Sequence, residues 1–408
     1  MRFAAKTHVA FVLLLLGSSL LLRLGVLFIV GLLCRGQEFT SDAAMHLAMA
    51  EQPMQVLTGE SSRFGQHPPL LPLLEFASMG PLRGWLPEFY VVRLGFLSFD
   101  LAATGLVLTR LATAPISAAK RRVMAGLVVA NPVSIMTTVV MAQDESIAAC
   151  FAIAALVLFD LRREGWASFV AGFGVVAAKI FLAPVALLLV YSSQRPGRTT
   201  WYALLPIAFC YGLALACRSS AFDVISFTPV PQFGINFWSL LVGTAISPTL
   251  ARNVSAVAAL ALGLLPLLLT RHGNRPSPSL CAATMLAGIF SVFYHVNPEY
   301  LLLPCALLSL EVDYPGRLVY AIVVGTLGWT VNLSYGVALA LKRGSTGGKG
   351  TLAHLFDDLS PFPAELVYPY LVVGFSIASV LLFLGLLGHC LAGTRQNPRL
   401  KPLLVTDR

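Results

Sequence analysis

The chain has 408 residues, of which 57% are apolar and only 12% are charged. A soluble domain carries roughly 25% charged residues, so this composition excludes an ordinary soluble protein. Several apolar runs reach the roughly 18 residues that a helix needs to cross a bilayer, and the alternating pattern of a membrane β-barrel is absent. The sequence therefore predicts an all-α, polytopic membrane protein.

The net charge of +9 does not indicate a nucleic-acid partner. Lysine and arginine gather in short segments between apolar runs, which is the positive-inside pattern of membrane proteins. The seven cysteines lie mostly inside apolar runs and have neither metal-binding spacing nor the spacing of a disulfide framework. We therefore expect no nucleic-acid partner and interpret the cysteines as small buried side chains.

The first apolar run, Val9–Leu33, is too long for the core of a signal peptide and predicts a retained helix. Arg2 and Lys6 place its start in the cytoplasm. We expect one membrane domain over 1–408. Its parts are the first helix at 9–33, an acidic outer loop at 36–89, a helical bundle at 91–391 and a cytoplasmic tail at 392–408.

The outer loop contains a short apolar piece, Leu70–Leu82, bracketed by prolines and Gly80. If this piece and Val91–Leu111 both crossed the membrane, the basic triplet Lys120-Arg121-Arg122 would lie on the wrong side. We therefore interpret Leu70–Leu82 as a re-entrant or interfacial half-helix and Val91–Leu111 as the second crossing.

The rest of the chain alternates between the two faces and gives about 10–12 helices in all. The segment Trp166–Tyr191 is a pair broken around Lys179 and Pro184, with basic residues at both ends. The other predicted segments are Val123–Met141, Ile147–Leu161, Trp201–Cys217, Leu250–Thr270, Leu280–Phe293, Leu301–Leu310, Leu318–Leu341 and Val367–Leu391.

With this topology, four polar stretches emerge on the non-cytoplasmic face. Charged residues near the ends of membrane helices are costly and often functional, and several on one face make a site more probable than one alone. The candidate residues are Glu38, Asp42, His46, Arg63, His67, Gln143, Asp144, Glu145, Lys179, Asn236, Trp238, His295, Glu299 and Tyr300.

Each stretch also has a plain structural interpretation. Asp42 and His46 share one face of a helix, as a catalytic acid with a polar neighbour or as a solvated N-terminal turn. Asp144 and Glu145 suit the positive end of a helix dipole. Lys179 is a lone cation among apolar residues, either snorkelling to the interface or binding an anion. The stretch from His295 to Tyr300 could be a simple turn.

Several short elements follow one another in a fixed order. Asp42 precedes His67-Pro68-Pro69-Leu70-Leu71 by 25 residues. The later elements are Arg93 with Phe99-Asp100, Asn131-Pro132 with Gln143-x-Glu145-Ser146, Ala178-Lys179 with Pro184, Asn236-Phe237-Trp238 and Glu299-Tyr300-Leu301-Leu302-Leu303-Pro304.

This ordered set, between about residues 10 and 310, resembles the GT-C glycosyltransferases that use polyprenyl-phosphate sugars. The nearest resemblance is to glycosylphosphatidylinositol mannosyltransferase I and bacterial polyprenyl-phosphate mannosyltransferases. In that family the first outer loop carries an Asp-x-Asp motif or a single aspartate. Thr40 stands where the first aspartate would be, although Glu38 is close enough to substitute. The resemblance therefore leaves a divalent metal open without requiring one, and the cofactor is unknown.

The resemblance implies an inverting transfer of a hexose, with mannose favoured, from a polyprenyl-phosphate donor to a lipid or glycan acceptor. Asp42 would be the catalytic base, and Lys179, Arg63 or His295 would stabilise the leaving phosphate. The membrane would be a bacterial plasma membrane or the endoplasmic reticulum. The resemblance also allows a small membrane protein as a partner subunit. The alternatives are a non-catalytic lipid-binding scaffold resembling the GPI transamidase membrane subunit, or a lipid transporter.

Overall fold

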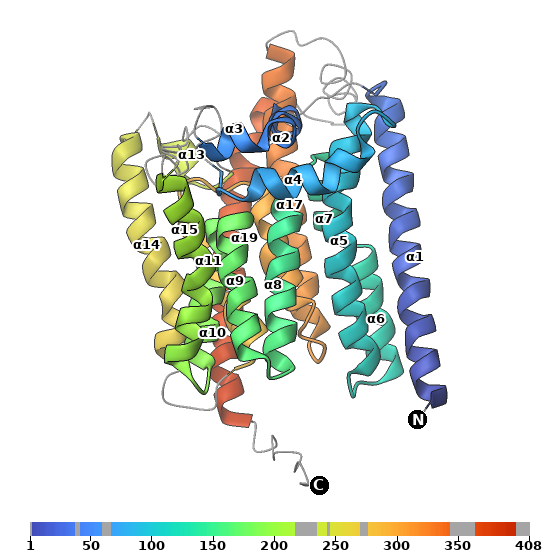
Figure 1. The fold of residues 1–408 in the computed structure, drawn as a ribbon. Coiled ribbons are helices and arrows are strands. Elements are labelled where there is room, and N and C mark those ends of the chain that lie inside the picture. Colours follow the sequence, from blue (N-terminus) through green and yellow to red (C-terminus); the bar gives the residue numbers. More distant parts are fainter. Residues whose placement is uncertain are drawn as a thin grey trace.

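The computed structural model describes residues 2–36, 41–58, 67–216, 235–242, 245–269, 276–342 and 364–396. In these residues the protein is all-α, and its extended segments amount to isolated bridges rather than strands. Long helices stand side by side, while α2 (Ser41–Glu51), α3 (Pro53–Thr58) and α4 (Leu71–Met79) lie across one end of the bundle (Figure 1). We call this the α2–α4 end.

Within the described part of the chain, seven helices are long and apolar enough to cross a membrane. They confirm the prediction of a multi-pass membrane protein. The spans are His8–Leu33, Glu88–Thr113, Ala118–Val140, Pro196–Ala216, Pro248–Leu269, Pro315–Tyr335 and Val367–Ala392. Shorter helices complete the bundle between them, and many leucine and valine side chains on the outer helices are exposed, as expected of surfaces that face lipid.

The helix bounds follow the predicted segments closely. The helices of the first half are α1 (Arg2–Leu33), α5 (Glu88–Thr113), α6 (Ala118–Val129), α7 (Pro132–Ile135), α8 (Glu145–Asp160), α9 (Glu164–Ala177) and α10 (Ala183–Ser192). Those of the second half are α11 (Pro196–Ala216), α13 (Trp238–Leu241), α14 (Pro248–Leu269), α15 (Pro278–Val292), α16 (Leu302–Leu308), α17 (Pro315–Lys342) and α19 (Ala364–Gln396). Single turns η2 (Gly80–Leu82), η4 (Ile180–Leu182) and η7 (Pro298–Leu301) connect them.

Local sequence accounts for several helix starts. The side chains of Ser117, Asn131 and Ser277 each accept a hydrogen bond from a backbone N–H in the first turn of α6, α7 and α15. Pro132 and Pro278 occupy the first helical position, where a missing N–H carries no penalty. Such helix starts can be recognised in a sequence, because Ser and Asn are preferred at the N-cap position.

Two predicted segments contain more local structure than the sequence indicated. Within 36–89, the helices α2 and α3 precede the predicted half-helix. The crossing predicted at Val123–Met141 is confirmed as the span Ala118–Val140, although Pro132 interrupts it after α6 and a π-helical turn, η3 (Met136–Val140), follows α7. The predicted half-helix at Leu70–Leu82 is confirmed as α4 and η2, which lie across the bundle instead of spanning it.

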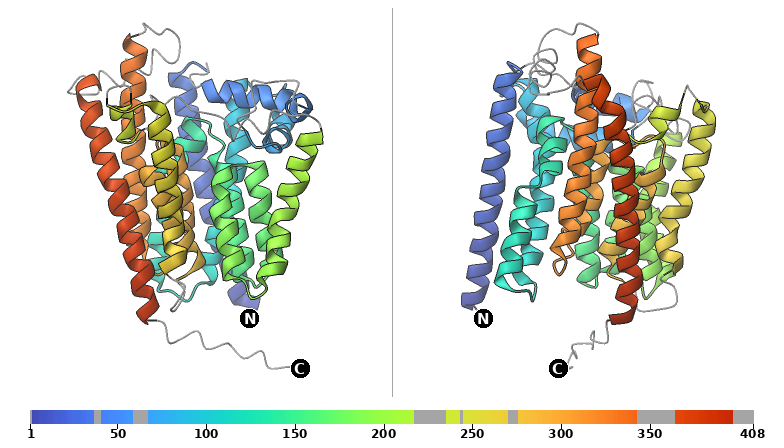
Figure 2. Two further views of the ribbon diagram at one scale, coloured as in Figure 1. Left: turned by 90° about the vertical axis from the view of Figure 1, so that its left-hand side faces the viewer. Right: turned by 180° about the vertical axis from the view of Figure 1, so that it is seen from behind.

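The opposite end of the bundle carries the basic segments. There α1 begins and α19 ends (Figure 2). His8 on α1 lies beside Arg121 and Arg122 on α6, lining one small hollow. Arg163 before α9 and Arg195 after α10 line another hollow, so both ends of the broken pair lie on one side, as predicted. We call this the basic end.

Candidate functional site

The helix α2 presents two of the predicted residues on one face. Asp42 lies in its first turn and is partly exposed, and its Oδ2 accepts a hydrogen bond of 3.0 Å from Nε2 of Gln143. His46 follows one turn later and points inward, with only 1% of its surface exposed. The two residues therefore lie on one face of a helix as predicted, but Asp42 is partly exposed and His46 is buried.

His46 is paired with Glu75 of α4. Its Nδ1 lies 2.6 Å from Oε1 of Glu75, and the edge of its ring packs against Phe96 at 5.0 Å between centroids. Burial alone would lower the pKa of His46, but the Glu75 carboxylate outweighs it and raises this pKa to about 9. Burial raises the pKa of Glu75 to about 7 despite the attraction of His46. The pair therefore holds a proton at neutral pH.

His67 completes this corner of the site. Its ring centroid lies 5.8 Å from that of His46, and the segment that carries it is fixed by a 2.9 Å hydrogen bond from the Leu70 N–H to the Val176 carbonyl of α9. Burial and the charge of Lys179 lower the pKa of His67 to about 3, so the ring is neutral. Its buried Nε2 has no hydrogen-bond partner among the described residues.

A distorted turn delivers the next three residues. The π-helical turn η3 ends at Val140, and Ala142 adopts a left-handed φ of 54°. The Gln143 N–H then donates to the Thr137 carbonyl at 2.9 Å, which aims the Gln143 side chain at Asp42. Asp144 and Glu145 follow directly at the start of α8 and are buried. π-Turns often mark functional positions because they redirect side chains within a helix.

Lys179 is not the lone cation that the sequence suggested. It occupies the break between α9 and η4, and its Nζ lies 2.9 Å from Oδ1 of Asp144 and 3.0 Å from Oε1 of Glu145. The start of α8 packs beside this break, which sequence spacing alone could not reveal. Because two carboxylates surround one ammonium, an incoming phosphate would have to share this lysine with them.

The predicted residues between α15 and α16 also reach this cluster. Nζ of Lys179 lies 5.9 Å from the ring centroid of Tyr300, and Glu299 is close enough to interact electrostatically with Glu145 and Asp42. Burial and the charge of Lys179 lower the pKa of His295 to about 4. The Tyr300 ring packs against Phe181 at 4.9 Å, which fixes it beside the break in the α9–α10 pair.

Two of the predicted site residues, Asn236 and Trp238, form hydrogen bonds away from the acidic residues. Trp238 donates through Nε1 to the Val292 carbonyl at 2.7 Å and is 8% exposed, and Asn236 donates to the Phe293 carbonyl. These bonds join the segment 235–242 to the end of α15 rather than to the acidic residues. Glu38 and Arg63, the remaining two predictions, lie outside the described residues.

We call the remaining residues the polar cluster. Its members are Asp42, His46, His67, Glu75, Gln143, Asp144, Glu145, Lys179, His295, Glu299 and Tyr300. They come from five separate stretches of the chain, at 42–46, 67–75, 143–145, 179 and 295–300, and meet at the α2–α4 end. Sequence reasoning missed Glu75, although a carboxylate inside an otherwise apolar half-helix is itself a signal.

Several buried polar atoms of the cluster lack hydrogen-bond partners within the part of the chain that is described. They are His67 Nε2, Glu75 Oε2, Asp144 Oδ2, Glu145 Oε2 and His295 Nδ1. Buried polar atoms are nearly always paired, so such a concentration suits a place where a polar ligand or ordered water is bound. No three His, Cys, Asp or Glu side chains in the described ranges converge in a geometry suited to a metal ion.

Comparison with known proteins does not identify the chain. No protein-family model matches it, and no curated protein matches it. A functional assignment therefore has to come from the polar cluster.

Proposed function

We propose that the protein is a membrane glycosyltransferase that moves a hexose, with mannose favoured, from a polyprenyl-phosphate donor to a lipid or glycan acceptor. The observation that carries the proposal is the polar cluster, in which a partly exposed carboxylate, Asp42, stands beside buried polar atoms that lack partners. The resemblance of the ordered motifs to GT-C enzymes supplies the reaction class.

Asp42 is the proposed base. Transfer with inversion needs a carboxylate within hydrogen-bond reach of the acceptor hydroxyl, and general-base catalysis contributes about 10²–10⁴-fold to a rate. The hydrogen bond from Gln143 occupies Oδ2 and orients the carboxylate. The partial exposure of Asp42 would let an acceptor approach it from outside the bundle.

Lys179 is the proposed partner of the departing phosphate. A leaving phosphate gains negative charge, and a positioned cation stabilises that charge. In the absence of donor, Asp144 and Glu145 hold the ammonium in place at 2.9 and 3.0 Å. A neutral His67 with an open Nε2 and a neutral His295 with an open Nδ1 are further groups that could hydrogen-bond a sugar.

The orientation proposed here puts the α2–α4 end outside the cytoplasm, because the arginine and lysine segments gather at the other end. The membrane would be a bacterial plasma membrane or the endoplasmic reticulum. In both, polyprenyl-linked donors can present their phosphate at the surface where the polar cluster lies.

The test is sugar transfer in isolated membranes from radiolabelled polyprenyl-phosphate donors. Asp42→Asn should lower the transfer rate by about 10²-fold or more, because it removes the base while keeping a similar shape. Asp313→Asn is the matched control, since Asp313 is an exposed carboxylate at the basic end.

Two outcomes would contradict the proposal in different ways. Full activity of the Asp42→Asn protein would mean that Asp42 is not the base. Absence of transfer from any polyprenyl-phosphate donor, with intact binding of the donor lipid, would favour the non-catalytic scaffold. The transporter alternative predicts instead that labelled lipid moves between leaflets without transfer of its sugar.

A further inference from the structure

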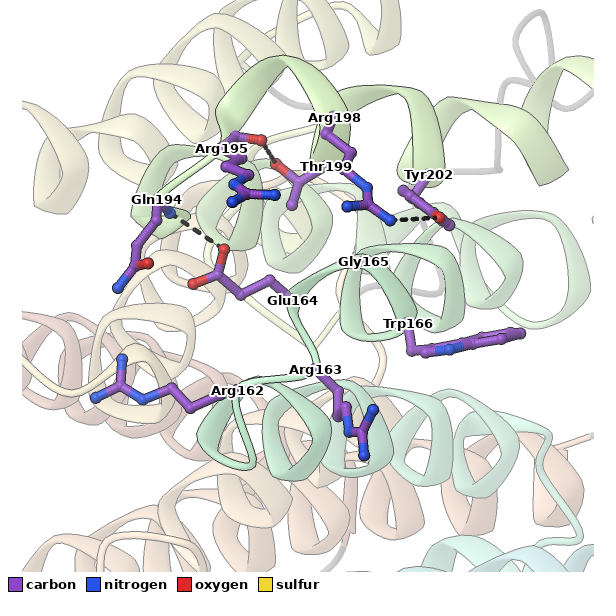
Figure 3. A pocket seen from close by; sticks show the side chains of 10 residues that line it. All are labelled: Arg162, Arg163, Glu164, Gly165, Trp166, Gln194, Arg195, Arg198, Thr199 and Tyr202. Atoms are coloured by element: carbon purple, nitrogen blue, oxygen red, sulfur yellow. Dashed lines mark hydrogen bonds between the residues drawn. The ribbon is translucent and has the colours of Figure 1, made fainter. Parts of the chain in front are cut away.

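A second polar feature lies at the basic end, far from the polar cluster. A hollow of about 580 Å³ is formed where the α8–α9 turn meets the start of α11. Figure 3 shows the ten residues that line it, which are Arg162, Arg163, Glu164, Gly165, Trp166, Gln194, Arg195, Arg198, Thr199 and Tyr202. We call it the arginine hollow.

The arginine hollow carries a surplus of positive charge, because it has four arginines and one carboxylate. That carboxylate, Glu164, already accepts hydrogen bonds from the Ser193 hydroxyl at 2.7 Å and the Gln194 N–H at 3.2 Å. Within the described part of the chain, the guanidinium groups of Arg163 and Arg195 have no hydrogen-bond or ion-pair partner. Their donors therefore remain available for an anion.

Arg162, at the rim of the hollow, has a backbone conformation that is unfavourable for a residue with a side chain. Arg162 has a left-handed φ of 61° directly after α8. Glycine is the residue usually found at this position after a helix, because it adopts that conformation without steric strain. An arginine here is disfavoured by the backbone, which suggests that its charge has a use.

The surroundings place the hollow at the level of lipid headgroups. Trp166 lines it and is 60% exposed, and Trp201 on α11 is 76% exposed. Tryptophan concentrates at the membrane–water interface. Further along α11, Leu205 and Phe209 expose 58% and 69% of their surfaces, as helix faces in contact with acyl chains do. A ligand in the hollow could thus have both a phosphate and a hydrocarbon part.

We propose that the arginine hollow binds the phosphate of an anionic membrane lipid. Guanidinium groups bind phosphate oxygens through paired, charge-assisted hydrogen bonds, and basic pockets between membrane helices suit anionic headgroups. Arg163 and Arg195 supply the unpaired donors, and Arg162 and Arg198 add charge at the rim. This site is independent of the sugar transfer proposed above and lies at the opposite end of the bundle.

Native mass spectrometry of the full chain in detergent tests this site by counting bound lipid. The titrants are phosphatidylglycerol, phosphatidylcholine and inorganic phosphate. The wild-type protein should bind one phosphatidylglycerol in preference to phosphatidylcholine. Arg195→Gln and Arg162→Gly should each weaken that binding about fivefold, as expected for one interfacial cation.

The two variants and a control separate binding from folding. Arg162→Gly relieves a left-handed backbone strain, so it should fold at least as well as the wild type while binding less lipid. Arg122→Gln is the control, because Arg122 is an exposed arginine at the same end but outside the hollow. Unchanged phosphatidylglycerol binding in both variants, or equal binding of phosphatidylcholine, would overturn the proposal. Displacement of the lipid by an equal concentration of inorganic phosphate would assign the hollow to a soluble phosphate instead.

Discussion

At the scale of residues, the polar cluster depends on pairings between distant stretches of the chain. His46 was visible in the sequence as a neighbour of Asp42, but its contact is with Glu75, 29 residues later. Both groups are completely buried, and each retains its proton more tightly than it would in an unfolded chain. The contribution of this pair to the stability of the folded protein, through the contact of α2 with α4, therefore depends on pH.

The pKa of His46 is raised from 6.5 to about 9 and that of Glu75 from 4.5 to about 7, so the folded state binds protons more tightly than the unfolded state. The stabilising contribution is fully present below the unfolded values and is lost as the pH rises through about 7 and then about 9.

We therefore predict that the melting temperature of the wild-type protein falls between about pH 6 and about pH 10 more steeply than that of a His46→Gln/Glu75→Gln protein, which has no titrating pair. The measurement is thermal unfolding in one detergent across that pH range. Parallel curves for the two proteins would show that the pair does not titrate in the folded state.

At the scale of elements, a close helix contact joins α9 to α11. A Cβ at Gly172 of α9 would lie 2.0 Å from the backbone oxygen of Ala203 in α11. Small residues allow membrane helices to approach this closely, since lipid provides little hydrophobic drive for association. The same pair of helices carries the walls of the arginine hollow.

Gly172→Ala should consequently lower the stability by about 1–3 kcal/mol, because backbone atoms cannot yield as a flexible side chain can. Gly212→Ala on α11 is the matched control, since nothing lies within 4 Å of its added Cβ and alanine is the better helix former. Thermal unfolding of both variants in detergent provides the comparison. Equal stability of the two would indicate that α9 and α11 can separate at little cost.

A buried ion pair fixes α1 to the rest of the bundle. Nε of Arg23 lies 2.5 Å from Oδ2 of Asp100, and the guanidinium also donates to the Ser134 hydroxyl at 2.9 Å. The sequence pattern points to Asp100, whereas Arg23 lies inside the predicted first helix at 9–33 and carries no signal of its partner. A charged residue at membrane depth normally faces a partner inside the bundle, and α1 follows this rule although most of its surface is exposed.

At the scale of the whole molecule, polar side chains gather at both ends of the bundle. The polar cluster occupies the α2–α4 end, and the arginine hollow occupies the basic end. The positive-inside rule predicts that the basic end faces the cytoplasm. This orientation is a prediction that labelling can test.

Single cysteines placed at Trp85 and at Ala119 should react from opposite sides of the membrane. Trp85 is 86% exposed near the α2–α4 end, and Ala119 is exposed at the start of α6. In a chain without Cys150 and Cys217, produced in the plasma membrane of a bacterial host, an impermeant maleimide should label Trp85→Cys in intact cells and Ala119→Cys only after permeabilisation. The other cysteines are buried, which keeps the background low. The reverse pattern would place the polar cluster in the cytoplasm.

The sequence by itself determined the class of protein and most helix positions. Long apolar runs must be helical in a bilayer, because each backbone polar group needs an internal partner there. The prolines around Leu70–Leu82, together with the charge of Lys120-Arg121-Arg122, are enough to predict a half-helix there rather than a transmembrane crossing. These signals are local, so they can be detected without knowing which helices touch.

Only the tertiary structure decided which polar residues face one another. Lys179 is paired with two carboxylates rather than alone, because the start of α8 packs beside the break after α9. Glu75 pairs with His46 and Arg23 pairs with Asp100, each on a helix distant in sequence. The arginine hollow forms where two basic turns meet. The physical reason is that electrostatic pairing depends on distances across helices, which residue spacing along one helix does not encode.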